Sequence, residues 1–353
     1  MSWMIELLVV ITVLSLLMAR RASRLVWCGA IVAGLAWWTF AHAPSTALVV
    51  SAWVVFVPVA LLLIVTPLRH ALVIKPLLAL YRKIMPGMSD TEREALEAGT
   101  VWWEREIFSG RPDWHHLLGF PAPALSAEEQ AYLDGPTETL CGMISDWLIT
   151  EERHDLSKET WDYLKQQGFF GMIIPKRYGG LEFSANAHSA IVMKVASRSI
   201  SAGVTVMVPN SLGPAKLLLM YGTEEQKDHY LPRLASGREI PCFALTGPEA
   251  GSDAASMPDT GIICRQDFNG ESDVLGIRLN WEKRYITLGP VATLLGLAFH
   301  LYDPDHLAGE DDDVGITLAL IPTDTPGVEI GRRHYPMSQS FMNGPNRGRD
   351  VFI

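Results

Sequence analysis

Three apolar runs open the chain, and their lengths predict helices that cross a membrane. Residues 4–19, 25–41 and 46–65 are almost free of charge, with Glu6 the one charged residue inside them. A membrane span needs about 20 apolar residues, within a range of about 17–25. The third run fits this length well, the second fits, and the first is marginal. A cleaved signal peptide is disfavoured, because the arginines follow the first run and more apolar runs come after it.

The basic residues around these runs predict a topology. Three arginines lie between the first and second runs, no Lys or Arg lies between the second and third, and four basic residues follow the third: Arg69, Lys75, Arg82 and Lys83. By the positive-inside rule, three spans would place both basic segments in the cytoplasm and the N-terminus outside. Two spans, or one hairpin lying partly in the membrane, are the alternatives. Residues 67–85 also mix leucines with these basic residues, which is typical of a segment on anionic headgroups or of an ordinary amphipathic linker helix.

From residue 89 the pattern becomes that of a soluble helical domain. Two capping boxes begin helices, Ser89-Asp90-Thr91-Glu92 for a helix to about Trp103 and Ser126-Ala127-Glu128-Glu129 for a second one. Helical periodicity with glycine stops and N-caps then predicts four more helices. They cover residues 155–168, 184–202 and 211–221 and the segment after Thr223.

After Pro241 the periodicity changes to short alternating runs rich in Val, Ile, Leu and Thr, which is typical of β-strands. The runs are 241–246, 261–267, 273–280, 284–288, 291–302 and 314–322, with a turn signal at Asn269-Gly270. We expect a small barrel or sandwich. The fold class is therefore α+β, with a transmembrane region (1–66), a juxtamembrane linker (67–88), an all-α helical domain (89–240) and a β domain (241–353).

Composition narrows the functional classes. The 353-residue chain carries a formal net charge of −10, and it has no basic stripe interleaved with aromatic residues, so nucleic-acid binding is disfavoured. The four cysteines are scattered, without C-x-x-C or zinc-type spacing. We therefore expect reduced, mostly buried thiols and no metal site.

The stretch from Phe243 to Asp253 is the strongest candidate for chemistry. An apolar strand ends there in a turn with Gly247 and Gly251, flanked by the hydroxyls of Thr246 and Ser252. Exposed backbone N–H groups in such a turn can hold phosphate or the polar edge of a flat cofactor. From shape alone, a tight loop between two strands is the stronger interpretation.

Three ordered motifs change that balance. The pattern Leu-Thr-x-Pro-x-Ala-Gly-Ser-Asp at 245–253, with an aromatic residue two positions earlier, closely resembles the signature of the acyl-CoA dehydrogenase family. Residues 283–287, Lys-Arg-Tyr-Ile-Thr, resemble the family's Lys-x-Trp-Ile-Thr, and residues 221–232 resemble the segment upstream of the signature. The apolar N-terminus is similar to that of the membrane-attached bacterial fatty-acyl-CoA dehydrogenases.

The resemblance implies an activity and its partners. It implies FAD-dependent oxidation of a medium- or long-chain fatty acyl-CoA to trans-2-enoyl-CoA in β-oxidation, with electrons passed to an electron-transfer flavoprotein or a quinone-linked acceptor. It also implies contact with membrane lipid at the bacterial inner membrane and a homo-oligomer when the protein is full length. The distribution of basic residues favours three spans and places the catalytic body on the cytoplasmic side. An acyl-CoA oxidase and a non-catalytic membrane scaffold that retains the fold are the alternatives.

The resemblance also assigns residues. Eight of them would line the FAD, with Thr246 on the isoalloxazine edge and Ser252 near the pyrophosphate or the acyl-CoA: Phe243, Leu245, Thr246, Gly251, Ser252, Tyr285, Ile286 and Thr287. Two positions depart from the family pattern, since Gly247 replaces the usual Glu and Tyr285 the usual Trp. The resemblance implies that the catalytic glutamate belongs to a C-terminal helical domain, which we expect to lie outside this sequence. We therefore expect no catalytic residue here, Glu249 being a surface residue, and no turnover by this chain alone.

Overall fold

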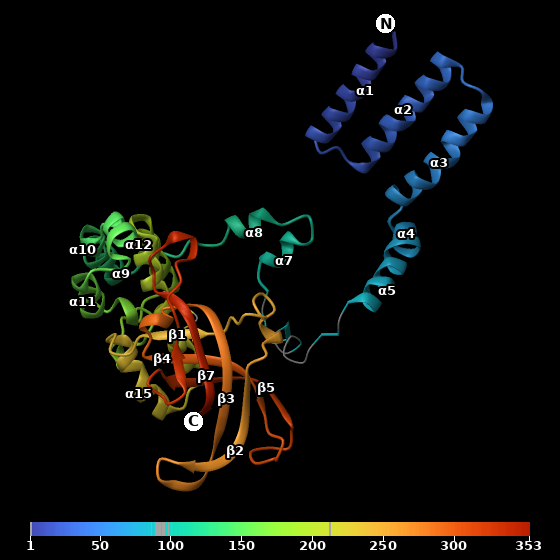
Figure 1. Ribbon diagram of the computed structural model, residues 1–353. Coiled ribbons are helices and arrows are strands. Elements are labelled where there is room, and N and C mark those ends of the chain that lie inside the picture. The colour runs from blue at the N-terminus through green and yellow to red at the C-terminus, as the bar shows by residue number, and fades with distance from the viewer. Residues whose placement is uncertain are drawn as a thin grey trace. The chain divides into compact units, whose positions relative to one another are not determined.

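The structure is a computed structural model that describes residues 2–85, 87–88, 93, 96–97, 99, 101–211 and 213–353 (Figure 1). It divides into two compact units, Met1–Leu96 and Glu97–Ile353, which are described separately. The predicted capping box at residues 89–92 lies outside the described residues.

The first unit begins with three helices at the three predicted apolar runs. They are α1 (Ser2–Ala19), α2 (Arg24–His42) and α3 (Thr46–Ile64). Two of the described helices, α2 and α3, are long and apolar enough to cross a membrane, whereas the apolar helix at residues 4–19 is shorter. Cys28 is the one buried residue of α2, and α3 has none, so neither is a core helix of this unit.

A second helical segment follows α3 after a break at Val65, whose backbone is extended (φ −86°, ψ 94°). It consists of α4 (Thr66–Arg69), a π-helical turn (His70–Ile74) and α5 (Lys75–Ile84). Arg69 Nη1 donates to the carbonyl oxygen of Leu63 at 3.0 Å, and Arg24 Nη1 donates to the same oxygen at 3.3 Å. Two basic side chains thus lie at the C-terminal end of α3, where they complement its partial negative charge.

The second unit begins with helices, some of which start at a polar N-cap side chain. They are α7 (Glu104–Ile107), α8 (Trp114–Leu118), α9 (Ala127–Asp134), α10 (Pro136–Met143), α11 (Lys158–Gln166), α12 (Ala185–Arg198), α13 (Ile200–Met207), α14 (Pro214–Tyr221) and α15 (Glu224–Ala235). The capping boxes at Ser126 and Thr223 are both present, as predicted. The predicted helix over 184–202 is two helices, because extended backbone at Ser199 (φ −154°, ψ 124°) separates α12 from α13.

Glu129 joins two helix starts inside this unit. Its Oε2 accepts the Ser126 N–H at 2.8 Å, which closes the capping box of α9, and its Oε1 accepts the Ser184 N–H at 2.7 Å, at the N-cap of α12. The side chain is buried. These hydrogen bonds from backbone N–H groups lower the pKa of Glu129 from 4.5 to about 2.

Replacing Glu129 by glutamine should lower the free energy of unfolding at pH 7 by about 1–3 kcal/mol, because an amide NH₂ would face one of the two N–H donors. Since the folded-state pKa is depressed, the carboxylate's contribution is present above about 4.5 and is lost as the pH falls toward about 2. Urea unfolding at several pH values should therefore show the gap between the two proteins closing in acid. Glu128→Gln, at the exposed neighbouring position, is the control. A gap that stays constant with pH would contradict this role.

The β region forms one curled seven-stranded sheet rather than two packed sheets (Figure 1). Its strands are β1 (Pro241–Ala244), β2 (Thr260–Phe268), β3 (Glu271–Thr287), β4 (Leu294–Tyr302), β5 (Asp313–Pro322), β6 (Val328–Ile330) and β7 (Asn343–Phe352). The strand order is β1-β4-β2-β3-β7-β6, with β5 paired to the other edge of β4. Both β1 and β2 run parallel to β4, and the other pairs are antiparallel.

The length of β3 differs from the prediction and matters for the site. The two predicted runs at 273–280 and 284–288 form one strand, which pairs with β2 through the two-residue turn Asn269-Gly270. Both turn residues have positive φ (51° and 86°), as tight hairpin turns require. The far end of β3 thereby reaches the end of β1, and the core of the sheet includes Trp281, Leu297 and Phe299.

Candidate functional site

The predicted turn after β1 is hydrogen-bonded to the last part of β3. The Arg284 N–H donates to the carbonyl oxygen of Thr246 at 2.9 Å, and Lys283 Nζ donates to that of Leu245 at 2.9 Å. The first two residues of the signature thus lie beside the second motif, although about forty positions separate them in sequence. The structure therefore brings together the two segments that the resemblance assigns to one site.

A buried ion pair holds this junction. Lys283 Nζ contacts Asp259 Oδ2, and the two side chains are 0% and 2% exposed. Asp259 Oδ1 also accepts the Glu282 N–H at 2.8 Å. Burial lowers the pKa of Lys283, and the Asp259 carboxylate opposes that shift. Lys283 lies within the motif at 283–287. Its partner Asp259 could not be predicted, because a single Asp before a strand is common in sequences.

A β-bulge aims the Tyr285 side chain away from the core. Lys283 pairs with Asn346 and Ile286 with Gly344, so β3 has one extra residue at this point relative to β7. Tyr285 has φ 56° and is 51% exposed, whereas Ile286 is buried in the core of the sheet. Bulges commonly redirect a side chain beside functional sites. The phenol ring is thus about half exposed, with the Arg284 guanidinium 4.6 Å from its centroid, and Ile286 packs into the core behind it.

Asn343 and His334 complete the surroundings of this bulge, and neither was predicted. Asn343 Nδ2 donates to the Tyr285 carbonyl oxygen at 3.0 Å and to Thr287 Oγ1 at 3.3 Å. The His334 ring lies 4.9 Å from the Tyr285 ring, centroid to centroid. Both residues belong to a part of the chain distant in sequence. The antiparallel pairing of β3 with β7 places Asn343 opposite Thr287. No sequence motif contains Asn343, so its position could not be predicted.

Four of the remaining predicted residues belong to the turn itself, whereas Phe243 does not. Thr246 and Leu245 are half-buried, and Gly251 and Ser252 are exposed. Phe243 lines a separate cavity of about 440 Å³ with Leu218 and Tyr221 of α14 and with residues of β4 and β5. Glu249 is exposed, as expected for a surface residue.

The structure gives a physical reason for the glycine at position 247, where the family pattern has a glutamate. Gly247 is buried, and a Cβ there would lie 3.3 Å from the Glu282 carbonyl oxygen. Any side chain at this position would have to displace β3 slightly or be displaced by it, since such a contact is tighter than ordinary packing. The glycine therefore permits the close approach of the turn to β3.

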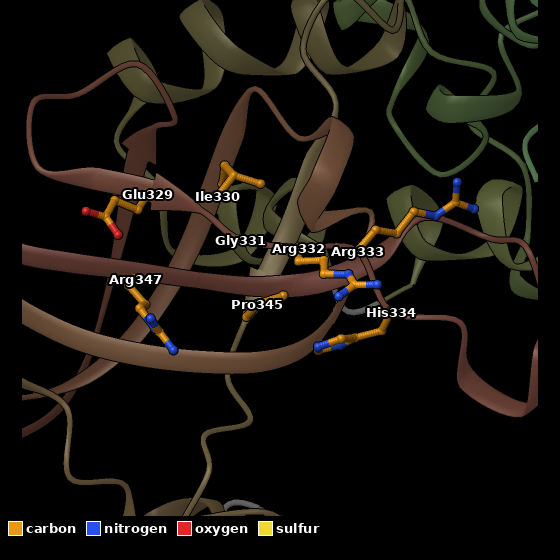
Figure 2. Close-up of a pocket in the computed structure, with 8 residues that line it drawn as sticks. All are labelled: Glu329, Ile330, Gly331, Arg332, Arg333, His334, Pro345 and Arg347. Carbon is orange, nitrogen blue, oxygen red and sulfur yellow. The ribbon is translucent and has the colours of Figure 1, made fainter.

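A basic pocket of about 500 Å³ adjoins the bulge through His334 (Figure 2). Three arginines line it: Arg332, Arg333 and Arg347. Arg347 forms an ion pair with Glu282 at 2.9 Å, and Arg333 donates to the Ser340 carbonyl oxygen at 2.7 Å. Figure 2 shows these two side chains extending in different directions, so the arginines hold neighbouring strands and loops in place.

In the part of the chain that the structure describes, no group of three or more His, Cys, Asp or Glu side chains is placed to hold a metal ion. What the site does offer is an exposed aromatic ring, two threonine hydroxyls and a turn of backbone N–H groups. This set of groups suits the flat, polar-edged ring of an organic cofactor.

A helical domain followed by a curled sheet, with a Gly/Ser turn joined to a bulged strand, defines the class of protein. Residues 126–238 match the acyl-CoA dehydrogenase N-terminal domain, and residues 242–345 match the acyl-CoA dehydrogenase middle domain. The chain belongs to the acyl-CoA dehydrogenase family, which confirms the resemblance found in its motifs.

Relatives with assigned names agree with this membership. A probable acyl-CoA dehydrogenase, FadE10 of Mycobacterium tuberculosis, is 31% identical over 246 residues, which are 69% of this chain and 36% of the relative. The mouse mitochondrial very long-chain specific acyl-CoA dehydrogenase is 34% identical over 147 residues, 40% of this chain and 22% of that protein. The chain thus spans roughly a third or less of the length of these relatives.

A solved structure shows the same fold. An acyl-CoA dehydrogenase from Bacillus anthracis, in complex with FAD, superimposes with a TM-score of 0.53 at 21% identity. The similarity covers 66% of this chain and 37% of that one.

Proposed function

We propose that this chain supplies one side of the FAD site of a fatty acyl-CoA dehydrogenase. The observation that carries the proposal is the junction of the two motifs, in which the Arg284 N–H donates to the Thr246 carbonyl oxygen at 2.9 Å. The relative from B. anthracis contains FAD, and the aromatic ring and hydroxyls at this junction have the chemistry that a flavin needs. FAD, when bound, would accept a hydride from the acyl chain.

The predicted residues divide between two kinds of contact. The hydroxyls of Thr246 and Thr287 would hydrogen-bond the polar edge of the flavin, and the exposed ring of Tyr285 would cover part of an apolar face. Ser252 and Gly251, in the exposed part of the turn, would lie near the pyrophosphate or the acyl-CoA. Leu245, Phe243 and Ile286 would keep these segments packed.

The finer assignments extend to the whole protein. We propose a medium- or long-chain acyl-CoA as substrate, trans-2-enoyl-CoA as product, and an electron-transfer flavoprotein or a quinone-linked acceptor as the electron partner. A carboxylate outside the described site would remove the α proton. The full-length protein would be a homo-oligomer.

Replacing Thr246 and Thr287 together by valine should weaken FAD binding on the order of tenfold or more, because two hydrogen bonds of about 1 kcal/mol each would be lost. Flavin absorbance per protein and a fluorescence titration of the complete gene product would measure the change. Thr317→Val, at a half-buried position of β5, is the matched control. Unchanged flavin content together with unchanged turnover would rule out the assigned contacts.

We also propose attachment to the bacterial inner membrane by three spans, with the catalytic body in the cytoplasm. Basic residues lie at the start of α2 and after α3 in the sequence, and two of them, Arg24 and Arg69, donate to the same Leu63 carbonyl oxygen. The basic residues therefore gather at one end of the helix pair, which supports a cytoplasmic location for that end.

A topology reporter tests this arrangement. A reporter fused after residue 45, between α2 and α3, should be located outside the cytoplasm, and one fused after residue 85 should be cytoplasmic. Alkaline phosphatase and green fluorescent protein fusions would report the two sides. A cytoplasmic location for residue 45 would defeat the three-span arrangement.

A further inference from the structure

The helix α5 has an apolar face that the described residues of its own unit leave exposed. Leu77, Leu80, Tyr81 and Ile84 follow one another at spacings of three, one and three positions, which places them on one side of a helix with about 3.6 residues per turn. Their exposed fractions are 49%, 53%, 64% and 70%. Isolated exposed leucines are ordinary, but four aligned large apolar side chains on ten residues indicate a surface that binds something.

The opposite face of α5 is basic. Lys75, Arg82 and Lys83 lie on it with the small residue Ala79 between them, and all of these positions are exposed. No Asp or Glu occurs between Glu6 and Asp90 in the sequence, so no acidic side chain of α5 or of its neighbouring helices α2 to α4 offsets these charges. A partner for this helix must therefore accept apolar side chains and offer negative charge.

The position of the helix in the chain selects one such partner. The candidate membrane span α3 ends at Ile64, and the segment that leads to α5 starts at Thr66. The hydrogen bond from Arg69 Nη1 to the Leu63 carbonyl oxygen joins this segment to the end of the span. Because only Val65 separates the end of α3 from the start of α4, the helical segment that contains α5 begins at the membrane surface.

We propose that α5 lies in the surface of the membrane that α2 and α3 cross, and binds anionic phospholipid. Leu77, Leu80, Tyr81 and Ile84 enter the boundary between headgroups and acyl chains, where tyrosine is favoured. Lys75, Arg82 and Lys83 reach the anionic headgroups, each strengthening binding about fivefold at low salt. This inference rests on the proposed membrane attachment and is independent of the FAD site.

Single labelled cysteines test the orientation in the whole chain. In a variant whose four native cysteines are replaced by alanine, Leu80→Cys and Ala79→Cys would each carry an environment-sensitive fluorophore, in vesicles of phosphatidylcholine with or without phosphatidylglycerol. With phosphatidylglycerol, the label at position 80 should be quenched by spin-labelled acyl chains and the adjacent label at 79 by aqueous iodide. Arg82→Gln should weaken the immersion of the label at 80 about fivefold, and salt should have the same effect.

Each outcome decides the proposal. Labels at 79 and 80 that are equally accessible to iodide would overturn it, and a label at 80 shielded from both quenchers would indicate a protein partner instead. Resistance of the chain to alkaline extraction reports the spans separately, and flavin content reports the FAD site, so a failure of either proposal is distinguishable from a failure of this one.

If the cysteine-free variant does not fold, hydrogen exchange of residues 75–85 in the unchanged protein replaces the labelling experiment. Protection that rises with phosphatidylglycerol supports the proposal, and protection that is independent of it contradicts it.

Discussion

Replacing Lys283 by methionine should lower the free energy of unfolding by about 3–5 kcal/mol, the usual range when one partner of a buried ion pair is removed. The substitution leaves Asp259, which is 2% exposed, as a charge without a counter-ion. It also removes the donor to the Leu245 carbonyl oxygen. Chemical or thermal unfolding of the purified protein would measure the loss.

The double variant Asp259→Asn/Lys283→Met separates charge from packing. It should recover much of the lost stability, because the asparagine oxygen can still accept the Glu282 N–H and no buried charge remains. Lys158→Met, which breaks an exposed ion pair with Asp162, is the control and should change stability by less than about 1 kcal/mol. If Lys283→Met unfolds like the unchanged protein, the pair does not hold the junction.

Replacing Gly348 by alanine should be almost as damaging. Gly348 of β7 lies opposite Trp281 of β3, and a Cβ at this glycine would be 1.9 Å from Trp281 Cζ3. The indole cannot easily move, because it is buried and its Nε1 donates to Asn346 Oδ1 at 2.9 Å. We expect a loss of about 3 kcal/mol, at the upper end of the range for overpacked cores.

A double-mutant cycle checks the cause of this loss. Trp281→Leu removes the ring atoms that the new methyl group would meet, so the two substitutions together should cost less than the sum of their separate effects. Gly309→Ala is the matched control, since no atom lies within 4 Å of a Cβ at that glycine. Strictly additive effects of Gly348→Ala and Trp281→Leu would show that the ring is not the obstacle.

Local patterns predicted the apolar helices, most of the later helices and the strands β1 to β5, but they gave no signal for β6 and β7. Capping boxes at Ser126 and Thr223 correctly located two helix starts, because a cap depends on residues three positions apart. The boundary at Ser199 was missed, since an Ala- and Ser-rich stretch has no local stop signal and its break is set by packing. The family motifs identified both segments of the candidate site, since each motif is continuous in sequence.

The sequence by itself determined the order of the apolar helices, the later helices and the strands as far as β5, the membership of the family, and the two motifs at 245–253 and 283–287. These features depend on periodicity, helix caps and continuous motifs, so they can be predicted from residues close together in the sequence. Only the tertiary structure decided how the motifs meet. The bulge that exposes Tyr285, the pairing of buried Lys283 with Asp259, and the contact of Asn343 with Tyr285 and Thr287 all join residues far apart in sequence. Strand register and burial create such contacts, and neither is encoded at any one position.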